Sequence, residues 1–275
     1  MVSTKLITIR EAANRMKCSN HLKQLGLAVH NLHDNYNVMP PLSANCADPA
    51  NANCFTQSSK FGTHNYTMFH FLLPFIEQDN LYRTLLTTAY AGGAYPTVIK
   101  TFICPSDPSL ANGMCRTTFG GANNWAASCY GGNNYVFGNP PAGTASGEWP
   151  FSAITDGLSN TVFFAEMYGT CGSSNDLANL WGSLWADANG TWRPGFNLGT
   201  SKGGGGLAAY PASPLFQAKP NFMTTCNPAV PQSGHTNGIN VGIGDGSVRY
   251  LPATINATTW AIVTDPRDGL TPGNW

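Results

Sequence analysis

The chain has 275 residues, of which only 10% are charged, and its 14 basic side chains balance its 14 acidic ones. This balance argues against a dedicated nucleic-acid-binding protein, because no basic excess exists to neutralise phosphates. The hydrophobic content of 42% excludes a disordered chain, and no apolar run approaches the roughly 20 residues of a membrane-spanning helix.

The first expected element is a proline-free helix over residues 5–33, which is rich in strong helix formers. Its apolar residues form two sets with helical spacing, first Leu6, Ile9, Ala13 and Met16, and then Leu22, Leu25, Val29 and Leu32. The phase changes near Cys18, which places the two sets on nearly opposite faces. We expect the second set to pack on the protein. The first set is expected to contribute to self-assembly, or to fray.

The paired prolines Pro40 and Pro41 end this helix, so residues 1–36 are expected as an N-terminal helix and residues 37–275 as a globular α+β head within one domain. A second helix is predicted for residues 66–87, with a bend near Pro74.

Short strands separated by turns are expected in the remainder of the chain. Residues 98–104 and 161–166 are predicted as strands, and residues 239–243 and 248–251 as a hairpin, since Asp-Gly between apolar runs favours a tight turn. The expected fold class is α+β, with the long helix first and an antiparallel, loop-rich sheet after it.

Eight cysteines without any Cys-x-x-Cys pair favour disulfides over a zinc ribbon. The favoured pairs are Cys46–Cys54, Cys115–Cys129, Cys171–Cys226 and Cys18–Cys104. Disulfides need an oxidising compartment, which predicts an extracellular or cell-surface protein. The alternative is eight buried thiols in a cytosolic protein.

Sequence motifs of enzymes are mostly missing, so no catalytic residue and no cofactor are expected. His30 and His33 share a helix face, where a metal is the less favoured alternative to capping the helix end. His235 is expected to fold back near Asp245 or Arg249 as a structural contact.

Two further binding hypotheses remain open. The polar turn over residues 156–161 offers oxygen ligands for calcium, although it also satisfies its own backbone. The cluster of Trp181, Trp185 and Trp192 offers a platform for carbohydrate, although core packing is the favoured use.

Several sequence blocks together resemble a bacterial prepilin-like family of uncertain function. The blocks are Arg10–Asn20, Leu22–His30, Leu72–Gln78 with Leu81 and Tyr82, Phe102–Pro108, Ile154–Thr161 with Ala165 and Glu166, and His235–Arg249. The motif residues among them are His235, Asp245, Gly246, Asp156, Gly157, Asn160 and Glu166.

The resemblance implies a pilin-like fold and a structural role in an extracellular filament or secretion apparatus, with pilin-like subunits as partners. Members sometimes labelled solute-binding imply the alternative, an extracytoplasmic module that binds a carbohydrate or another solute. Pilin-like precursors carry a cleavage site and about 20 apolar residues before this point. Met1–Ile9 stands in that place here, so we expect this chain to lack an export signal and a membrane segment.

Overall fold

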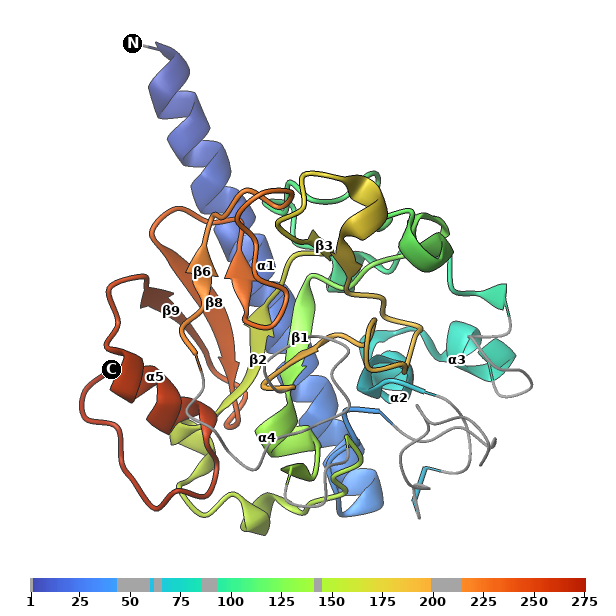
Figure 1. Ribbon diagram of the computed structural model, residues 1–275. Coiled ribbons are helices and arrows are strands. Elements are labelled where there is room, and N and C mark those ends of the chain that lie inside the picture. The colour runs from blue at the N-terminus through green and yellow to red at the C-terminus, as the bar shows by residue number, and fades with distance from the viewer. Residues whose placement is uncertain (1, 44–59, 62–65, 86–92, 141–144, 199–213) are drawn as a thin grey trace.

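The computed structural model describes residues 2–43, 60–61, 66–85, 93–140, 145–198 and 214–275. It has the expected α+β class, with a long N-terminal helix packed on a mainly antiparallel sheet (Figure 1). Among the helices of these residues, none combines the length and the hydropathy that a bilayer-crossing segment requires.

Helix α1, Val2–Tyr36, extends beyond the head at its N-terminal end (Figure 1). The four residues of the second apolar set, Leu22, Leu25, Val29 and Leu32, are fully buried, as their spacing predicts. Asn37 ends the helix in a left-handed conformation with φ of 59°, and its N–H bonds to the His33 carbonyl.

The second predicted helix is divided into three short pieces: α2 (Met68–Leu72), a 3-10 turn (Leu73–Ile76) and α3 (Asp79–Leu85). Pro74 lies in the 3-10 turn, and Glu77 after it has a positive φ of 63°. Both features interrupt the α-helical hydrogen bonds, so the expected bend is a complete break.

The main sheet has five strands in the order β5 (Gly195–Phe196), β1 (Tyr130–Asn133), β2 (Val162–Glu166), β8 (Gly238–Ile243) and β9 (Val248–Pro252). The β5–β1 pair is parallel and the other pairs are antiparallel. The predicted strand at 161–166 and the predicted hairpin are confirmed as β2 and as β8–β9. Two small sheets pair β3 (Thr170–Cys171) with β4 (Trp181–Gly182) and β6 (Gln217–Ala218) with β7 (Gln232–Ser233).

Helices cover both faces of the sheet. On one face Leu22 of α1 lies in the same core as Phe164 of β2. On the other face α5, Ala257–Thr264, places Trp260 in a core with Val241 of β8. The short helix α4, Asn134–Phe137, directly follows β1.

The prediction of a strand at residues 98–104 is wrong, because Lys100–Phe102 form a 3-10 turn. Ile99 and Phe102 are both buried three residues apart, which is a helical spacing and not the alternation of a strand. Further 3-10 turns are Phe119–Asn124, Phe151–Ala153, Leu158–Asn160 and Leu177–Asn179.

Candidate functional site

A buried carboxylate lies at the end of β2. Glu166 is 2% exposed, and its Oε2 accepts hydrogen bonds from Ser233 Oγ at 2.6 Å and from the Asn240 amide at 3.1 Å. Its Oε1 accepts from Asn240 Nδ2 at 2.7 Å and lies 3.0 Å from His235 Nε2. A buried carboxylate is costly unless it is hydrogen-bonded and paired, and these four contacts meet that need.

His235 connects this carboxylate to helix α1. Its Nδ1 lies 2.5 Å from Glu11 Oε1, and Ser106 Oγ donates to the other oxygen of Glu11 at 2.9 Å. Burial alone would lower the pKa of His235, but the hydrogen bonds and negative charges of Glu166 and Glu11 outweigh it and raise the pKa. The imidazole therefore joins two carboxylates that belong to different layers of the fold.

A disulfide lies beside the Glu–His–Glu relay, which consists of Glu11, His235 and Glu166. Cys18 of α1 is bonded to Cys104, as predicted, and the Cys104 sulfur is 3.8 Å from His235 Nε2. Cys18 and Glu11 are seven residues apart, which is two helical turns, so both reach the head from one face of α1. The donor atoms of Cys18, Cys104, Glu166 and His235 all lie within 4.8 Å of one another, and all four residues are buried.

The Asp-Gly turn at the opposite end of β8 also holds α1. Lys23 Nζ donates to the Gly246 carbonyl at 2.7 Å, and His30 Nε2 bonds to the Gly244 carbonyl at 2.8 Å. A Cβ placed on Gly26 would lie 3.2 Å from Gly246 Cα, so the helix and the turn are in close backbone contact. Gly246 has a φ of 79°, which also favours glycine at this position.

These contacts explain the spacing of the C-terminal motif. His235 precedes β8 and Asp245 follows it, so the strand separates them by about 20 Å. Glu11 and Gly26 are separated along α1 by about 22 Å, which is nearly the same length. His235 therefore does not fold back on Asp245 or Arg249, and the two ends of the motif hold two points of α1.

The other motif residues lie near the Asp-Gly turn. Asn160 Nδ2 donates to the Asp156 carbonyl at 2.9 Å, and the Gly244 amide donates to the Thr161 carbonyl at 2.9 Å. Gly157 has a φ of 93°. At the Asp-Gly turn itself, Asp245 Oδ1 accepts a hydrogen bond from the Ser247 amide. Asp156 Oδ1 accepts from the Gly269 amide, and calcium at this turn stays a prediction.

The predicted Cys171–Cys226 disulfide is also confirmed, whereas the Cys115–Cys129 prediction is wrong. Cys129 Sγ instead donates to Asp107 Oδ2 at 3.2 Å, and Cys115 Sγ lies 3.4 Å from Thr170 Oγ1. Burial and the Asp107 charge raise the pKa of the Cys129 thiol well above its ordinary value. The Cys46–Cys54 prediction lies outside the described residues.

The remaining predicted sites are not assembled as ligand clusters. His33 Nε2 accepts from the Phe151 amide while His30 bonds to the Asp-Gly turn, so the two rings are used separately. Trp185 is fully buried in the main core, whereas Trp181 and Trp192 pack with Phe119 elsewhere. The three tryptophans therefore do not form one platform.

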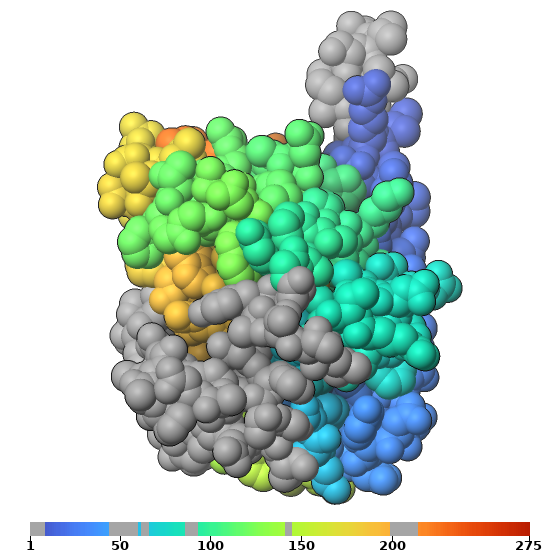
Figure 2. Space-filling view, turned by 90° about the vertical axis from the view of Figure 1, so that its right-hand side faces the viewer, coloured from blue at the N-terminus to red at the C-terminus, as the bar shows by residue number. Residues whose placement is uncertain are grey.

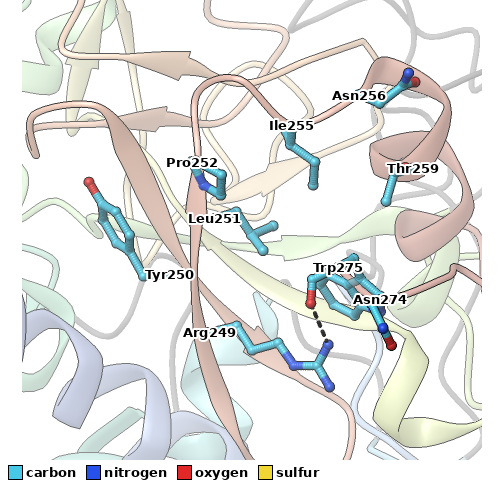
Figure 3. Close-up of a pocket in the computed structure, with 9 residues that line it drawn as sticks. All are labelled: Arg249, Tyr250, Leu251, Pro252, Ile255, Asn256, Thr259, Asn274 and Trp275. Atoms are coloured by element: carbon cyan, nitrogen blue, oxygen red, sulfur yellow. Dashed lines mark hydrogen bonds between the residues drawn. The ribbon is translucent and has the colours of Figure 1, made fainter.

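A surface groove of about 540 Å³ lies between β9, α5 and the C-terminus (Figure 3). Arg249 is stacked over Trp275 with its guanidinium carbon 4.2 Å from the ring centre, and its Nη1 donates to the Trp275 carbonyl at 3.4 Å. Asn256 and Asn274 add amide groups to the lining. The composition of this groove suits a small polar ligand.

A family model described as a protein of unknown function (DUF1559), and named SBP_bac_10, matches residues 8–258. The chain belongs to this family. No curated protein and no solved structure matches it. The matched range contains Glu11, Glu166 and His235 of the relay, and also Ser233 and Asn240, which donate to Glu166.

Reasoning from the sequence did not select Glu11, Ser233 or Asn240. The sequence does carry a signal for Glu11. A residue two helical turns before a disulfide-bonded cysteine lies on the same face of the helix, and so it faces the same part of the head. Ser233 and Asn240 carry no comparable signal, since their role depends on how β7 and β8 are placed against β2.

Proposed function

We infer that the chain is a non-enzymatic, pilin- or pseudopilin-like structural subunit of an extracellular filament or secretion apparatus. The observation that carries this proposal is the position of α1, which extends beyond the head at its N-terminal end (Figure 1) and whose dark blue turns run along one edge of the head in Figure 2. On α1, Ile9 is 66% exposed and Met16 is 64% exposed. Of the other residues predicted for self-assembly, Ala13 is partly buried, and the side chain of Leu6 lies outside the described part.

Three exposed apolar residues, Ile9, Met16 and Leu27, lie along one line of α1. Ile9 and Leu27 are 18 residues apart, which is five full turns, and Met16 lies within about 20° of the same line. Leu27 is 48% exposed. An apolar line on a helix that already has a buried opposite face is suited to contact with another helix. The zero net charge of the chain does not oppose the approach of further copies.

The attachments of α1 support a structural role for the helix. The Cys18–Cys104 disulfide, the Glu11–His235 contact and the Lys23–Gly246 hydrogen bond fix the helix to the head at three levels. Load applied to the projecting end would therefore reach the sheet through covalent and buried contacts. The Cys18–Cys104 and Cys171–Cys226 disulfides also suit an oxidising, extracytoplasmic compartment.

The test is assembly of the full chain, measured by sedimentation velocity over a range of concentrations and by electron microscopy. We expect concentration-dependent assemblies for the wild type and their loss in the Ile9→Asp/Met16→Asp variant. Leu270→Asp is the matched control, because Leu270 is 52% exposed and lies outside α1. A wild-type chain that stays monomeric at high concentration, without filaments, would refute the proposal.

A second candidate function is solute binding, and the groove at Trp275 favours it (Figure 3). The label of the matching family model points to solute-binding proteins. Tryptophan and asparagine side chains suit neutral sugars. An array of neutral oligosaccharides tests this candidate. Binding by the wild type and by Trp181→Ala, but not by Trp275→Ala, supports it, and no binding by the wild type contradicts it.

A further inference from the structure

Four buried side chains, two from the Glu–His–Glu relay and two from the neighbouring disulfide, are of types that bind metals. Two are thiols in their reduced form, one is an imidazole and one is a carboxylate: Cys18, Cys104, His235 and Glu166. Zinc(II) takes sulfur, nitrogen and oxygen donors of these kinds in four-coordinate sites. We propose that the reduced Cys18–Cys104 pair, together with His235 and Glu166, forms a closed zinc(II) site.

The distances in the oxidised structure already approach those of such a site. Zinc–sulfur and zinc–nitrogen bonds of about 2.3 and 2.0 Å place sulfur and nitrogen about 3.5 Å apart in a tetrahedron. The Cys104 sulfur and His235 Nε2 are 3.8 Å apart, and Nε2 is 3.0 Å from Glu166 Oε1. The main change is the separation of the two sulfurs to about 3.8 Å once their bond is reduced.

The outer contacts of the cluster orient its ligands. The Glu11 carboxylate accepts from Nδ1 of His235, which leaves Nε2 as the nitrogen that faces the sulfur. A carboxylate on the outer nitrogen is the usual support of a zinc-bound histidine. Asn240 Nδ2 and Ser233 Oγ hold the Glu166 carboxylate in the same manner.

The disulfide and the zinc site are alternative states of the same two sulfurs. A phosphine reductant breaks the S–S bond and becomes a phosphine oxide with the oxygen of one water, whose two hydrogens complete the two thiols. Zinc(II) then replaces the two thiol protons, and it displaces any proton on His235 Nε2. A small disulfide such as oxidised glutathione takes the two electrons of the zinc-bound thiolates and, with two protons, becomes two thiols, while the Cys18–Cys104 bond reforms and zinc(II) is released.

The experiment uses the full chain, reduced anaerobically with a phosphine and freed of metal, and then titrated with cobalt(II) and with zinc(II). We expect one cobalt per chain, with a thiolate-to-cobalt charge-transfer band and the visible spectrum of a tetrahedral ion. Zinc displaces the cobalt, and the oxidised chain gives neither band. The Cys171→Ser/Cys226→Ser variant is the matched control, because it lacks the Cys171–Cys226 disulfide but retains all four ligands. It is expected to bind cobalt and zinc like the wild type.

Loss of a ligand in Cys18→Ser or His235→Gln is expected to abolish the tetrahedral spectrum. Glu11→Gln, which changes only the outer support, is expected to weaken zinc binding by about 10- to 100-fold. Circular dichroism of each reduced variant, with and without zinc, separates lost binding from lost folding. The proposal is overturned if the reduced, folded wild type binds no metal, if His235→Gln binds equally well, or if reduction unfolds the wild type and zinc does not restore it.

Discussion

Glu11 Oε1 and His235 Nδ1 lie 2.5 Å apart, although 224 residues separate them in the chain. One belongs to the helix and the other to the head, so this contact reports directly on how the two are joined. His235 is buried and also meets Glu166, whereas Glu11 is partly open to solvent. The pair therefore connects a buried polar network to the surface at the level where α1 leaves the head.

A double-mutant cycle measures the strength of this contact. We expect Glu11→Gln and His235→Gln each to lower the free energy of unfolding, with a coupling energy of about 1–2 kcal/mol between them. His235→Gln is the more harmful change, because it removes the imidazole that the buried Glu166 carboxylate meets at 3.0 Å. Urea denaturation of the four proteins gives the coupling. Glu77→Gln, at an exposed glutamate, is the control and should be nearly neutral, and additive effects would contradict the contact.

The close approach of Gly26 to Gly246 predicts that a larger side chain at position 26 moves the helix from the turn. A Cβ there would meet the Gly246 backbone at 3.2 Å, and the branched side chain of valine adds further atoms. We expect Gly26→Val to lower the free energy of unfolding by about 1–3 kcal/mol, since overpacked contacts displace the backbone.

Leu27→Val is the matched control for this change, because it introduces the same residue at the next, exposed position of α1. It should cost only a few tenths of a kcal/mol through helix propensity. Hydrogen exchange of the Gly246 amide, which bonds to the Ile243 carbonyl, should accelerate in Gly26→Val alone. Equal effects of the two variants would show that the contact is not tight.

The elements that the sequence predicts well are those with a local signal. Leu22, Leu25, Val29 and Leu32 are buried as their helical spacing indicates, and the Asp-Gly turn forms the expected hairpin. The failures depend on distant neighbours. The 98–104 segment resembles a strand in composition, but the contacts of Ile99 and Phe102 with the core select a turn.

The candidate site shows the same division. His235 and Glu166 stand out as motif residues, but their contact with each other requires β8 to pair with β2. Cysteine pairing could not be deduced from spacing alone. The short separation of Cys115 and Cys129 in the sequence favours a disulfide between them. In the structure, however, Cys129 Sγ donates to the Asp107 carboxylate instead.

The cysteine arrangement predicts a specific peptide map. Alkylation in denaturant without a reductant should label Cys129, while peptides with Cys18 and Cys104 stay linked, as do those with Cys171 and Cys226. Mass spectrometry before and after reduction makes the comparison. A linked peptide containing both Cys115 and Cys129 would contradict the structure.

The Cys18–Cys104 bridge is also expected to dominate the attachment of α1. It spans 86 residues, and loop-closure entropy predicts that Cys18→Ser/Cys104→Ser lowers the free energy of unfolding by about 4.6 kcal/mol. Cys129→Ser, at a buried thiol outside both bridges, is the control and should cost much less. Thermal unfolding under non-reducing conditions distinguishes them, and an equal loss in both variants would show that the bridge adds little.

The burial of His70 predicts that the protein loses stability in acid. It is fully buried between Tyr66 and Trp185, and burial lowers its pKa to about 3, although a hydrogen bond with the Thr67 backbone opposes the shift. The unfolded chain binds a proton below about pH 6.5, while the folded chain does not until about pH 3, so stability falls as pH falls through this window. Between pH 7 and pH 4.5 the loss from this group is about 2.5 kcal/mol.

The variant His70→Asn isolates this contribution. Asparagine keeps an acceptor near the Thr67 amide, which bonds to His70 Nδ1 at 3.2 Å, but it does not titrate. The smaller side chain should make the variant less stable at pH 7. Between pH 7 and pH 4.5, its free energy of unfolding should nevertheless fall by about 2.5 kcal/mol less than that of the wild type. Urea denaturation of both proteins at both pH values gives this difference, in which the other titrating groups cancel. Identical pH dependence in the two proteins would contradict the lowered pKa of His70. It would imply a partner for the buried Nε2 atom, which has none among the residues that the structure describes.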